Sequence, residues 1–322
     1  MCTVISYKNK DSYFGRNLDL ERGYGEGVVI TPRKFVFPMR CQEPVRLHYA
    51  MIGMATVVDE FPLYFEATNE KGLSMAGLNF PENAVYFDFM KEKENVTPFE
   101  FIPWILGDCC CIEEAEEKLK KTNLVNISFN KRLPLSPLHW MISDQEKSIV
   151  VESVKEGLKI YENPFEILTN NPPFEFHKIY MSHYMGVNTG PAISKFGEHL
   201  PMDHYSLGMG ALGLPGDFSS TSRFVRAVFV KENSVANDDE KSSVNQFFHM
   251  LNAVAMPKGC VWTPNGYEYT RYSSCCNVNR GIYYYKTYDE FEIQSVNLYD
   301  VDLNGSKLYQ MSPAGIEPTT TA

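Results

Sequence analysis

The second residue of the chain, Cys2, combines two groups that could do chemistry together. If Met1 is removed, Cys2 carries both a nucleophilic thiol and a free α-amine. The amine has a pKa of about 7.7–8.0 and the thiol one of about 8.5, so near neutral pH the amine can accept the thiol proton. With Met1 attached, the same nitrogen is an amide and cannot act as a base. A cysteine also occurs at position 2 by chance, so the interpretation depends on the residues around it.

A charged motif follows Cys2 after a short turn: Phe-Gly-Arg-Asn-Leu-Asp at 14–19. If this segment forms a strand that pairs with the first one, Arg16 and Asp19 lie beside Cys2. A guanidinium near the sulfur lowers the pKa of the thiol, and a carboxylate can hold the amine in position. A surface ion pair between Arg16 and Asp19 is the alternative interpretation.

Three more polar residues stand in turns or at an expected helix start. Asn79 ends the motif Ala-Gly-Leu-Asn, and Asn170 precedes Asn-Pro-Pro. Each could supply an N–H donor to a developing oxyanion, or each could be ordinary turn chemistry ahead of a proline. Arg223 follows a Gly-Pro loop and several serines, a pattern typical of a helix N-terminus that faces a site, or simply of a capped helix.

The elements that must position these residues alternate between strands and pairs of helices. Period-2 apolar patterns predict strands, and capping signals with apolar spacing of three and four predict helices. The predicted strands span 3–7, 28–37, 47–57, 63–68, 73–79, 138–143, 148–154, 158–161, 268–276, 281–287 and 292–297, and the predicted helices span 97–106, 112–121, 220–230 and 243–255. This order favours antiparallel sheets covered by helices over a doubly wound βαβ fold.

Composition excludes several classes of protein. The chain has 322 residues and a formal net charge of −10, which argues against a general nucleic-acid or anionic-membrane binder. It contains no apolar run near the roughly 18 residues of a transmembrane helix and no secretory signal pattern at its start, so we expect a cytoplasmic protein.

The eight cysteines have poor spacing for a disulfide framework, because three are consecutive and two more are adjacent. Cys109, Cys110 and Cys111 could suggest a metal, but no C-x-x-C pair or nearby histidine completes a tetrahedral set. We therefore expect these three to be small, buried apolar side chains beside a helix, and we predict no metal site.

Taken together, these segments resemble the choloylglycine hydrolase family, which comprises conjugated bile salt hydrolases and penicillin V acylases. The resemblance runs from Cys2 to about Leu308. Besides the motifs above, it includes Met-Cys-Thr at the start, Asn-Glu-Lys-Gly-Leu at 69–73, Leu-His-Trp at 138–140, Ser-Ile-Val-Val-Glu at 148–152, Leu-Pro-Gly-Asp at 214–217 and Gly-Ile-Tyr-Tyr-Tyr at 281–285.

This resemblance implies the N-terminal nucleophile hydrolase fold, an α+β, four-layer αββα sandwich of two antiparallel sheets between helix layers. It implies one domain over 1–310 with Met1 removed, and it leaves 311–322, rich in Pro and Thr, as a tail expected to be disordered. The family commonly forms homotetramers, for which the segment 172–201 is the expected contact region.

The resemblance also implies roles for the candidate residues. Cys2 is the nucleophile and acid/base, Arg16 and Asp19 tune and position it, Asn79 and Asn170 form the oxyanion site, and Arg223 closes the polar network. An apolar trough for the steroid is implied along Leu18, Tyr24, Val58, Phe65, Phe129 and Leu133, although core packing is the alternative interpretation for most of them. Neither a metal nor an organic cofactor is implied.

The expected reaction is hydrolysis of the amide that joins a bile acid to glycine or taurine, through a thioester on Cys2. Asn79 favours bile salts, since acylases of the penicillin type tend to carry Tyr at that position. Penicillin V acylase activity is the alternative within the family. A catalytically silent sterol- or lipid-binding protein and a metal-binding module on the three consecutive cysteines are alternatives of other classes.

Overall fold

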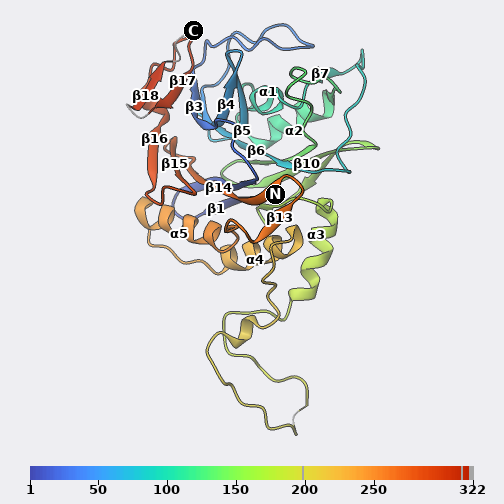
Figure 1. Cartoon of the computed structure of the whole chain (residues 1–322), viewed down its shortest axis with the longest axis vertical. Coiled ribbons are helices and arrows are strands. Elements are labelled where there is room, and N and C mark those ends of the chain that lie inside the picture. The colour runs from blue at the N-terminus through green and yellow to red at the C-terminus, as the bar shows by residue number, and fades with distance from the viewer. Residues whose placement is uncertain (198, 313–314, 319–322) are drawn as a thin grey trace.

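Two stacked antiparallel sheets form the centre of the protein (Figure 1). The computed structural model describes residues 1–197, 199–312 and 315–318. The first sheet has the order β12-β1-β2-β14-β15-β16, with β13 also paired to β14. Its strands are β1 (Cys2–Lys8), β2 (Ser12–Leu20), β12 (Ile167–Leu168), β13 (Val261–Thr263), β14 (Gly266–Asn277), β15 (Ile282–Thr287) and β16 (Gln294–Asn297).

The second sheet has nine strands in the order β11-β10-β9-β6-β5-β4-β3-β17-β18. They are β3 (Gly27–Thr31), β4 (Met51–Val58), β5 (Phe61–Asn69), β6 (Ser74–Asn79), β9 (Leu138–Ser143), β10 (Ser148–Val154), β11 (Gly157–Glu162), β17 (Tyr309–Ser312) and β18 (Gly315–Pro318). A short parallel pair, β7 (Glu94–Val96) and β8 (Thr122–Leu124), lies outside both sheets.

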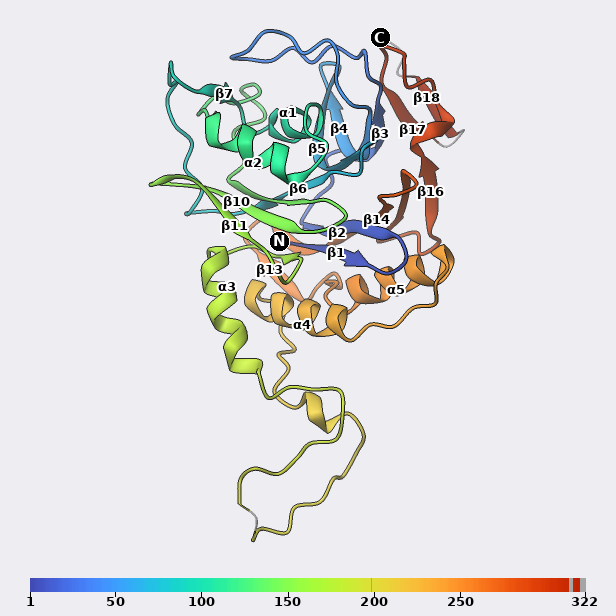
Figure 2. The same ribbon diagram turned by 180° about the vertical axis from the view of Figure 1, so that it is seen from behind.

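Helices cover the outer face of each sheet (Figures 1 and 2). The first sheet packs on α4 (Ser220–Glu232) and α5 (Glu240–Asn252), with α3 (Phe174–Tyr180) beside them, and the second packs on α1 (Phe101–Leu106) and α2 (Ile112–Lys121). One apolar cluster fills the space between the sheets and under α4 and α5, and another fills the space under α1 and α2. This arrangement is the four-layer αββα sandwich, so the predicted fold class is confirmed. None of the described helices is long and apolar enough to cross a membrane.

Two predicted strands are shorter than expected because their ends make other bonds. The strand predicted over 28–37 ends at Thr31, where Pro32 cannot donate to a sheet ladder. The strand predicted over 47–57 begins only at Met51, because the N–H of Ala50 donates to the Glu70 carboxylate at 2.9 Å. Helix α2, by contrast, has the predicted bounds and buries one face through Ile112, Ala115 and Leu119.

The end of the chain differs from the disordered tail expected over 311–322. Strand β17 pairs with β3 through Tyr309 opposite Ile30 and Gln310 opposite Val29, and β18 pairs with β17. Without β17, the N–H and C=O groups along one side of β3 would form an open sheet edge, and such edges readily accept another strand. Residues 313–314 and 319–322 lie outside the described part of the chain.

A long arm leaves the body between α3 and α4, spanning residues 181–219 apart from residue 198 (Figures 1 and 2). It contains two short 3-10 helices, Met181–Tyr184 and Met209–Ala211. The arm continues from the end of α3 and returns to the start of α4, the helix that carries Arg223.

Candidate active site

The pairing of β1 with β2 sets the geometry around Cys2. Cys2 lies opposite Leu18, and Val4 lies opposite Arg16. Side chains alternate along strands, so Cys2, Leu18 and Arg16 face the second sheet whereas Asp19 faces the helix layer. The predicted strand pair is therefore confirmed, and it brings Arg16 and Asp19 beside Cys2 on opposite faces of the first sheet.

The Cys2 backbone is held at both of its polar atoms. Its nitrogen donates to Oδ1 of Asn170 at 2.6 Å, and Nη2 of Arg223 donates to the same oxygen at 2.9 Å. Nη1 of Arg223 donates to the Cys2 carbonyl at 2.5 Å and to Oγ1 of Thr3 at 2.7 Å. All four residues are buried, with Cys2 3% exposed, so these bonds fix the residue in a site screened from water.

Arg16 lies between Cys2 and the second sheet and is fully buried. Its Nη1 donates to the carbonyls of Phe65 at 2.9 Å and Gly77 at 2.7 Å. Its Nε and Nη2 have no hydrogen-bond partner among the described residues. Burial lowers the pKa of Arg16, but the neighbouring Cys2, Tyr272 and Glu66 more than offset this, so the pKa is raised and the guanidinium stays charged. Arg16 can therefore stabilise a thiolate at Cys2.

Asp19 is a buried carboxyl group on the other face of the first sheet. Its Oδ1 accepts from Oγ1 of Thr270 at 2.6 Å, and its Oδ2 has no hydrogen-bond partner within the described structure. Burial raises the pKa of Asp19, and Arg223, the chain amine and Thr270 oppose that rise. Asp19 follows Leu18, the residue opposite Cys2, so its buried carboxyl group can stabilise an ammonium group at the start of β1.

Met1 extends the pairing of β1 with β2 by one residue. Its amine donates to the Asp19 carbonyl at 2.9 Å and forms an ion pair with Glu268, and its carbonyl accepts from the Asp19 N–H at 3.0 Å. In the chain with Met1 the Cys2 nitrogen is an amide. Removal of Met1 turns this nitrogen into a free amine. Asn170 and Arg223 still hold the Cys2 backbone, so the amine keeps its position.

The two asparagines predicted for the oxyanion site are placed differently. Asn79 ends β6, its side chain is exposed, and its amide has no hydrogen bond to any described residue. Asn170 is buried, and its Nδ2 donates to the Asn79 carbonyl at 2.7 Å. One of the two N–H groups of the Asn170 amide is thus used, and its Oδ1 accepts from the Cys2 nitrogen. The second Asn170 N–H and the Asn79 side-chain amide have no partner among the described residues.

The six residues predicted for the steroid trough do not form one group. Leu18 and Phe65 belong to the apolar cluster that includes Cys2. A β-bulge at Phe65, where Met54 pairs with Glu66 and Ala55 with Tyr64, turns both Phe65 and Glu66 toward the first sheet.

The other four trough residues lie elsewhere. Phe129 packs on Phe61 and Phe99 in the cluster under α1 and α2. Tyr24 is exposed beside Arg22, and Val58 and Leu133 are half-buried outside both clusters.

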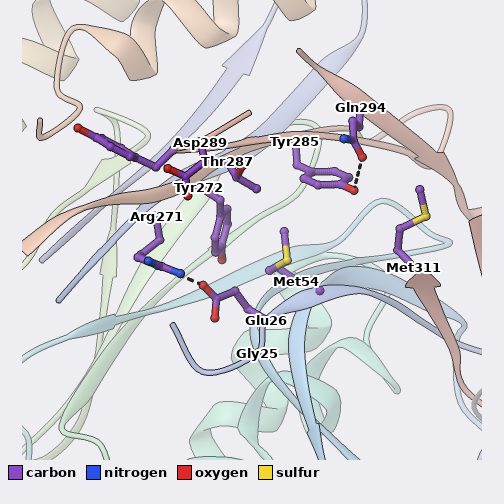
Figure 3. A pocket seen from close by; sticks show the side chains of 12 residues that line it. Gly25, Glu26, Met54, Arg271, Tyr272, Tyr285, Thr287, Asp289, Gln294 and Met311 are labelled. Atoms are coloured by element: carbon purple, nitrogen blue, oxygen red, sulfur yellow. Dashed lines mark hydrogen bonds and ion pairs between the residues drawn. The ribbon is translucent and has the colours of Figure 1, made fainter. Parts of the chain in front are cut away.

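A cavity of about 490 Å³ opens between the two sheets, where β3 and β4 face β14 and β15 (Figure 3). Its walls include Met54, Tyr272 and Tyr285, and the Arg271 guanidinium in its wall is paired with Glu26 at 3.5 Å. None of the six predicted trough residues lines it. Tyr272 also belongs to the surroundings of Arg16, so this cavity shares a wall with the site.

Sequence reasoning missed four polar residues that complete the site. Glu66 lies 3.7 Å from Arg16, Thr270 bonds Asp19, and Ser220 accepts from the Asn170 N–H at 2.8 Å. His177 contacts the Asn170 carbonyl through Nε2 at 3.0 Å. The signal for Glu66 is a lone acid in a strongly apolar strand, and Ser220 lies in the serine run before Arg223. Thr270 and His177 carry no local signal.

The three consecutive cysteines are only partly as predicted. Cys109 is buried, but Cys110 and Cys111 are half-exposed at the start of α2. Together with Glu114 they bring possible ligand atoms within 4.8 Å of one another. Glu114 already accepts from the Cys110 N–H at 2.7 Å, which makes it a local helix-start contact. This group is far along the chain from the polar residues around Cys2 and shares no contact with them.

Comparison with known proteins identifies the family. A model of the linear amide C–N hydrolases, choloylglycine hydrolase family, matches residues 2–311. The chain belongs to the choloylglycine hydrolase family. It is 50% identical over 309 residues to the "Bile salt hydrolase/transferase" of Lactiplantibacillus plantarum, covering 96% of this chain and 95% of that one. It is 37% identical to the protein of the same name in Clostridium perfringens, with 96% and 95% covered.

Solved structures of choloylglycine hydrolases and their neighbours share the fold. A mutant of the conjugated bile acid hydrolase from Clostridium perfringens superposes with a TM-score of 0.90 at 35% identity, covering 97% of each chain. Penicillin V acylase from Agrobacterium tumefaciens gives a TM-score of 0.77 at 18% identity, covering 99% of this chain and 98% of that one, which is a likeness of fold.

His177 makes stability depend on pH, because burial lowers its pKa to about 4 while an unfolded chain titrates near 6.5. As the pH falls from 6.5 toward 4, the unfolded chain takes up a proton that the folded protein refuses, so folded stability is lost. We predict that His177→Gln, which keeps a donor near the Asn170 carbonyl, removes about 2 kcal/mol of the loss between pH 7 and pH 4.5. Urea unfolding at both pH values measures this. Equal losses in the two proteins would contradict it.

Proposed function

We propose that this protein is a bile salt hydrolase that cleaves the amide bond between a bile acid and glycine or taurine. The observation that carries the proposal is the Cys2 constellation, in which one residue presents its sulfur to Arg16 and its nitrogen to Asn170. The two relatives described above from Lactiplantibacillus plantarum and Clostridium perfringens, which match this chain over nearly its whole length, are named for hydrolysis of bile salts or conjugated bile acids. The eight cysteines are all free thiols, the form that the cytoplasm maintains, and we propose that the enzyme acts there.

In the proposed reaction Met1 is removed and the free amine of Cys2 accepts the thiol proton. The thiolate attacks the carbonyl carbon of the substrate amide, and the negative charge moves to the carbonyl oxygen. As the carbonyl re-forms, the C–N bond breaks and the amine proton passes to the leaving glycine or taurine nitrogen. A thioester remains on Cys2. Water then attacks the thioester with the amine as base, releasing the bile acid and the thiol. These steps need neither a metal nor an organic cofactor.

The site residues divide this work according to their contacts. Arg16 stabilises the thiolate, and Asn170 with Arg223 holds the backbone on which both reacting groups of Cys2 are mounted. Asp19 balances the ammonium form of the amine. We assign the Asn79 amide and the second N–H of the Asn170 amide to the oxyanion, since the bond from Asn170 to the Asn79 carbonyl uses only one of its two N–H groups. For the steroid, we propose contact with Leu18 and Phe65 first, because both pack in the cluster that includes Cys2.

We also propose that the enzyme assembles into a homotetramer through the arm at 181–219. The arm projects from the body (Figure 2). Large apolar side chains are exposed along much of its length. These are Met185, Ile193, Phe196, Leu200, Met202, Tyr205, Leu207 and Leu212. A segment that exposes so many large apolar side chains is typical of a protein–protein contact.

We predict that Cys2→Ser abolishes hydrolysis of glycocholate and taurocholate and leaves the fold intact, because a hydroxyl is a far weaker nucleophile than a thiolate. Release of glycine or taurine measures activity, circular dichroism measures the fold, and mass spectrometry confirms loss of Met1 from the active protein. Cys41→Ser, which removes a half-buried thiol, is the control and keeps full activity. If the parent protein hydrolyses penicillin V but not bile salts, it is a penicillin V acylase. If it binds bile salts without hydrolysing them, it is a lipid-binding protein.

Asn79→Ala removes the free amide donor, and we predict a fall in kcat of about 10²–10³-fold for glycocholate with a smaller change in KM. The reason is that the oxyanion exists only in the transition state and the intermediate. Asn83→Ala, four residues along the chain, is the control and leaves kcat unchanged. Steady-state kinetics of both variants decide the matter. A kcat for Asn79→Ala within a factor of two of the parent would remove Asn79 from the oxyanion site.

For the arm, we predict that the double variant Phe196→Glu and Leu207→Glu lowers the mass of the assembly toward the monomer, because burying two carboxylates in an apolar contact is costly. Phe196 is 87% exposed and Leu207 fully so. Analytical ultracentrifugation measures the mass. Val235→Glu, an equally exposed apolar position outside the arm, is the control and keeps the parent's mass. Identical masses for all three proteins would refute assembly through the arm.

A further inference from the structure

A second buried charge stands behind Arg16. Glu66 of β5 is 1% exposed, and its Oε2 lies 3.7 Å from Nη1 of Arg16. The two residues come from different sheets, so the ion pair crosses the space between them. Arg16 faces Cys2 on one side and Glu66 on the other. A buried carboxylate at this place belongs to the electrostatics of the nucleophile, although it does not touch Cys2.

Three hydroxyl groups surround the Glu66 carboxylate. Tyr272 donates to Oε2 at 2.7 Å, and Ser274 and Tyr283 donate to Oε1 at 2.9 and 2.5 Å. Burial and the Glu66 charge hold the pKa of both tyrosines well above 10, so the phenols keep their protons and donate them. A carboxyl group that accepts three such bonds is stabilised in its ionised form. We call these four residues the Glu66 cluster.

Burial raises the pKa of Glu66, and Arg16 together with the three hydroxyl groups opposes that rise. The bonds that locate the Arg16 guanidinium go to the carbonyls of Phe65 and Gly77, not to Glu66. The 3.7 Å separation is longer than a hydrogen bond. Glu66 therefore acts on Arg16 mainly through its charge.

We propose that Glu66 acts on the Cys2–Arg16 pair through its charge: its carboxylate balances part of the guanidinium charge and so tunes the reactivity of the Cys2 sulfur. This inference rests on the proposed role of Cys2 as nucleophile. Arg16 alone would stabilise the thiolate strongly, and a strongly stabilised thiolate attacks slowly because nucleophilicity falls as the pKa falls. The negative charge of Glu66 offsets part of the positive charge of Arg16. Arg16 therefore stabilises the thiolate less, and the thiolate stays more nucleophilic.

Other charged groups around Cys2 must be held constant in a test. They are Arg16 and Asp19 of β2, Arg223 of α4, Glu268 of β14 and the chain amine, beside the neutral phenol of Tyr272. A substitution at Glu66 leaves all of these residues in the chain and, among their partners, removes only the partner of Arg16 and Tyr272. The measurement must report on the sulfur itself, and it must not depend on the identity of the substrate.

The test is the pH dependence of Cys2 alkylation by iodoacetamide in the folded protein without Met1, followed by mass spectrometry of the N-terminal peptide. For Glu66→Gln we expect the acid limb of the profile to move down by about one pH unit, because a negative charge near the sulfur has been removed. We expect the plateau rate at high pH to fall about threefold, as the nucleophilicity relation requires for a thiol of lower pKa. Glu66→Asp restores the charge and returns the profile toward the parent's.

The matched control is Glu70→Gln. Glu70 is also a carboxylate paired with an arginine, Arg33, and its side chain is 8% exposed, but neither residue is bonded to Arg16 or Cys2. Its alkylation profile should coincide with the parent's. An unshifted acid limb for Glu66→Gln would overturn the proposal, and so would a shift to higher pH, since that would mean Glu66 only keeps Arg16 in place.

If Glu66→Gln does not fold, Tyr283→Phe decides the question. It removes one donor to the carboxylate, which weakens the ionised form, and we expect a smaller shift of the acid limb in the same direction. No shift would overturn the proposal. Because iodoacetamide replaces the bile salt, a parent protein that fails to hydrolyse glycocholate refutes the proposed function without affecting this result.

Discussion

Oδ1 of Asn170 accepts one hydrogen bond from the Cys2 nitrogen and another from Arg223, and it can do so only where three segments of the chain meet. These are the start of β1, the loop after β12 and the first turn of α4. The same guanidinium holds the Cys2 carbonyl, so both polar atoms of this backbone unit are fixed. A nitrogen that has to serve as a base needs a defined position relative to the sulfur, and this double acceptor supplies it.

Oppositely charged groups lie on both faces of the first sheet, and of these Arg16 and Glu66 form an ion pair while Asp19 and Arg223 interact at longer range. Arg16 and Glu66 lie on the face toward the second sheet, and Asp19 and Arg223 lie on the helix side, all of them buried. An isolated buried charge is costly, whereas paired and hydrogen-bonded charges are tolerated. At the start of β1, the Cys2 sulfur therefore lies near Arg16 and Glu66, and the Cys2 nitrogen lies near Asp19 and Arg223. The chemistry of a single residue is in this way divided between two sides of a sheet.

The sequence was informative where a local pattern is enough to define the structure. Period-2 patterns located most strands, the bounds of α2 were predicted correctly, and the turn between residues 8 and 12 implied the pairing that brings Arg16 to Cys2. Long-range contacts were not predictable in the same way. Which atom of Asn170 faces Cys2 depends on β12 joining the sheet next to β1, and the inward direction of Glu66 depends on a bulge opposite Met54. The packing of Phe129 against Phe61 and Phe99 likewise joins segments that no local pattern connects.

The hydrogen bonds around Cys2 join residues far apart in the 322-residue chain: the bond to Asn170 joins residues 168 positions apart, and the bond from Arg223 joins residues 221 positions apart. Closing loops of that size is slow and entropically unfavourable until other contacts have formed. A nascent chain that has not yet delivered α4 from the ribosome has a cysteine at its front but lacks the acceptor and the guanidinium that arrange it. The hydrogen bonds that position Cys2 therefore form only after Asn170 and Arg223 have been synthesised and have folded against the N-terminal strand.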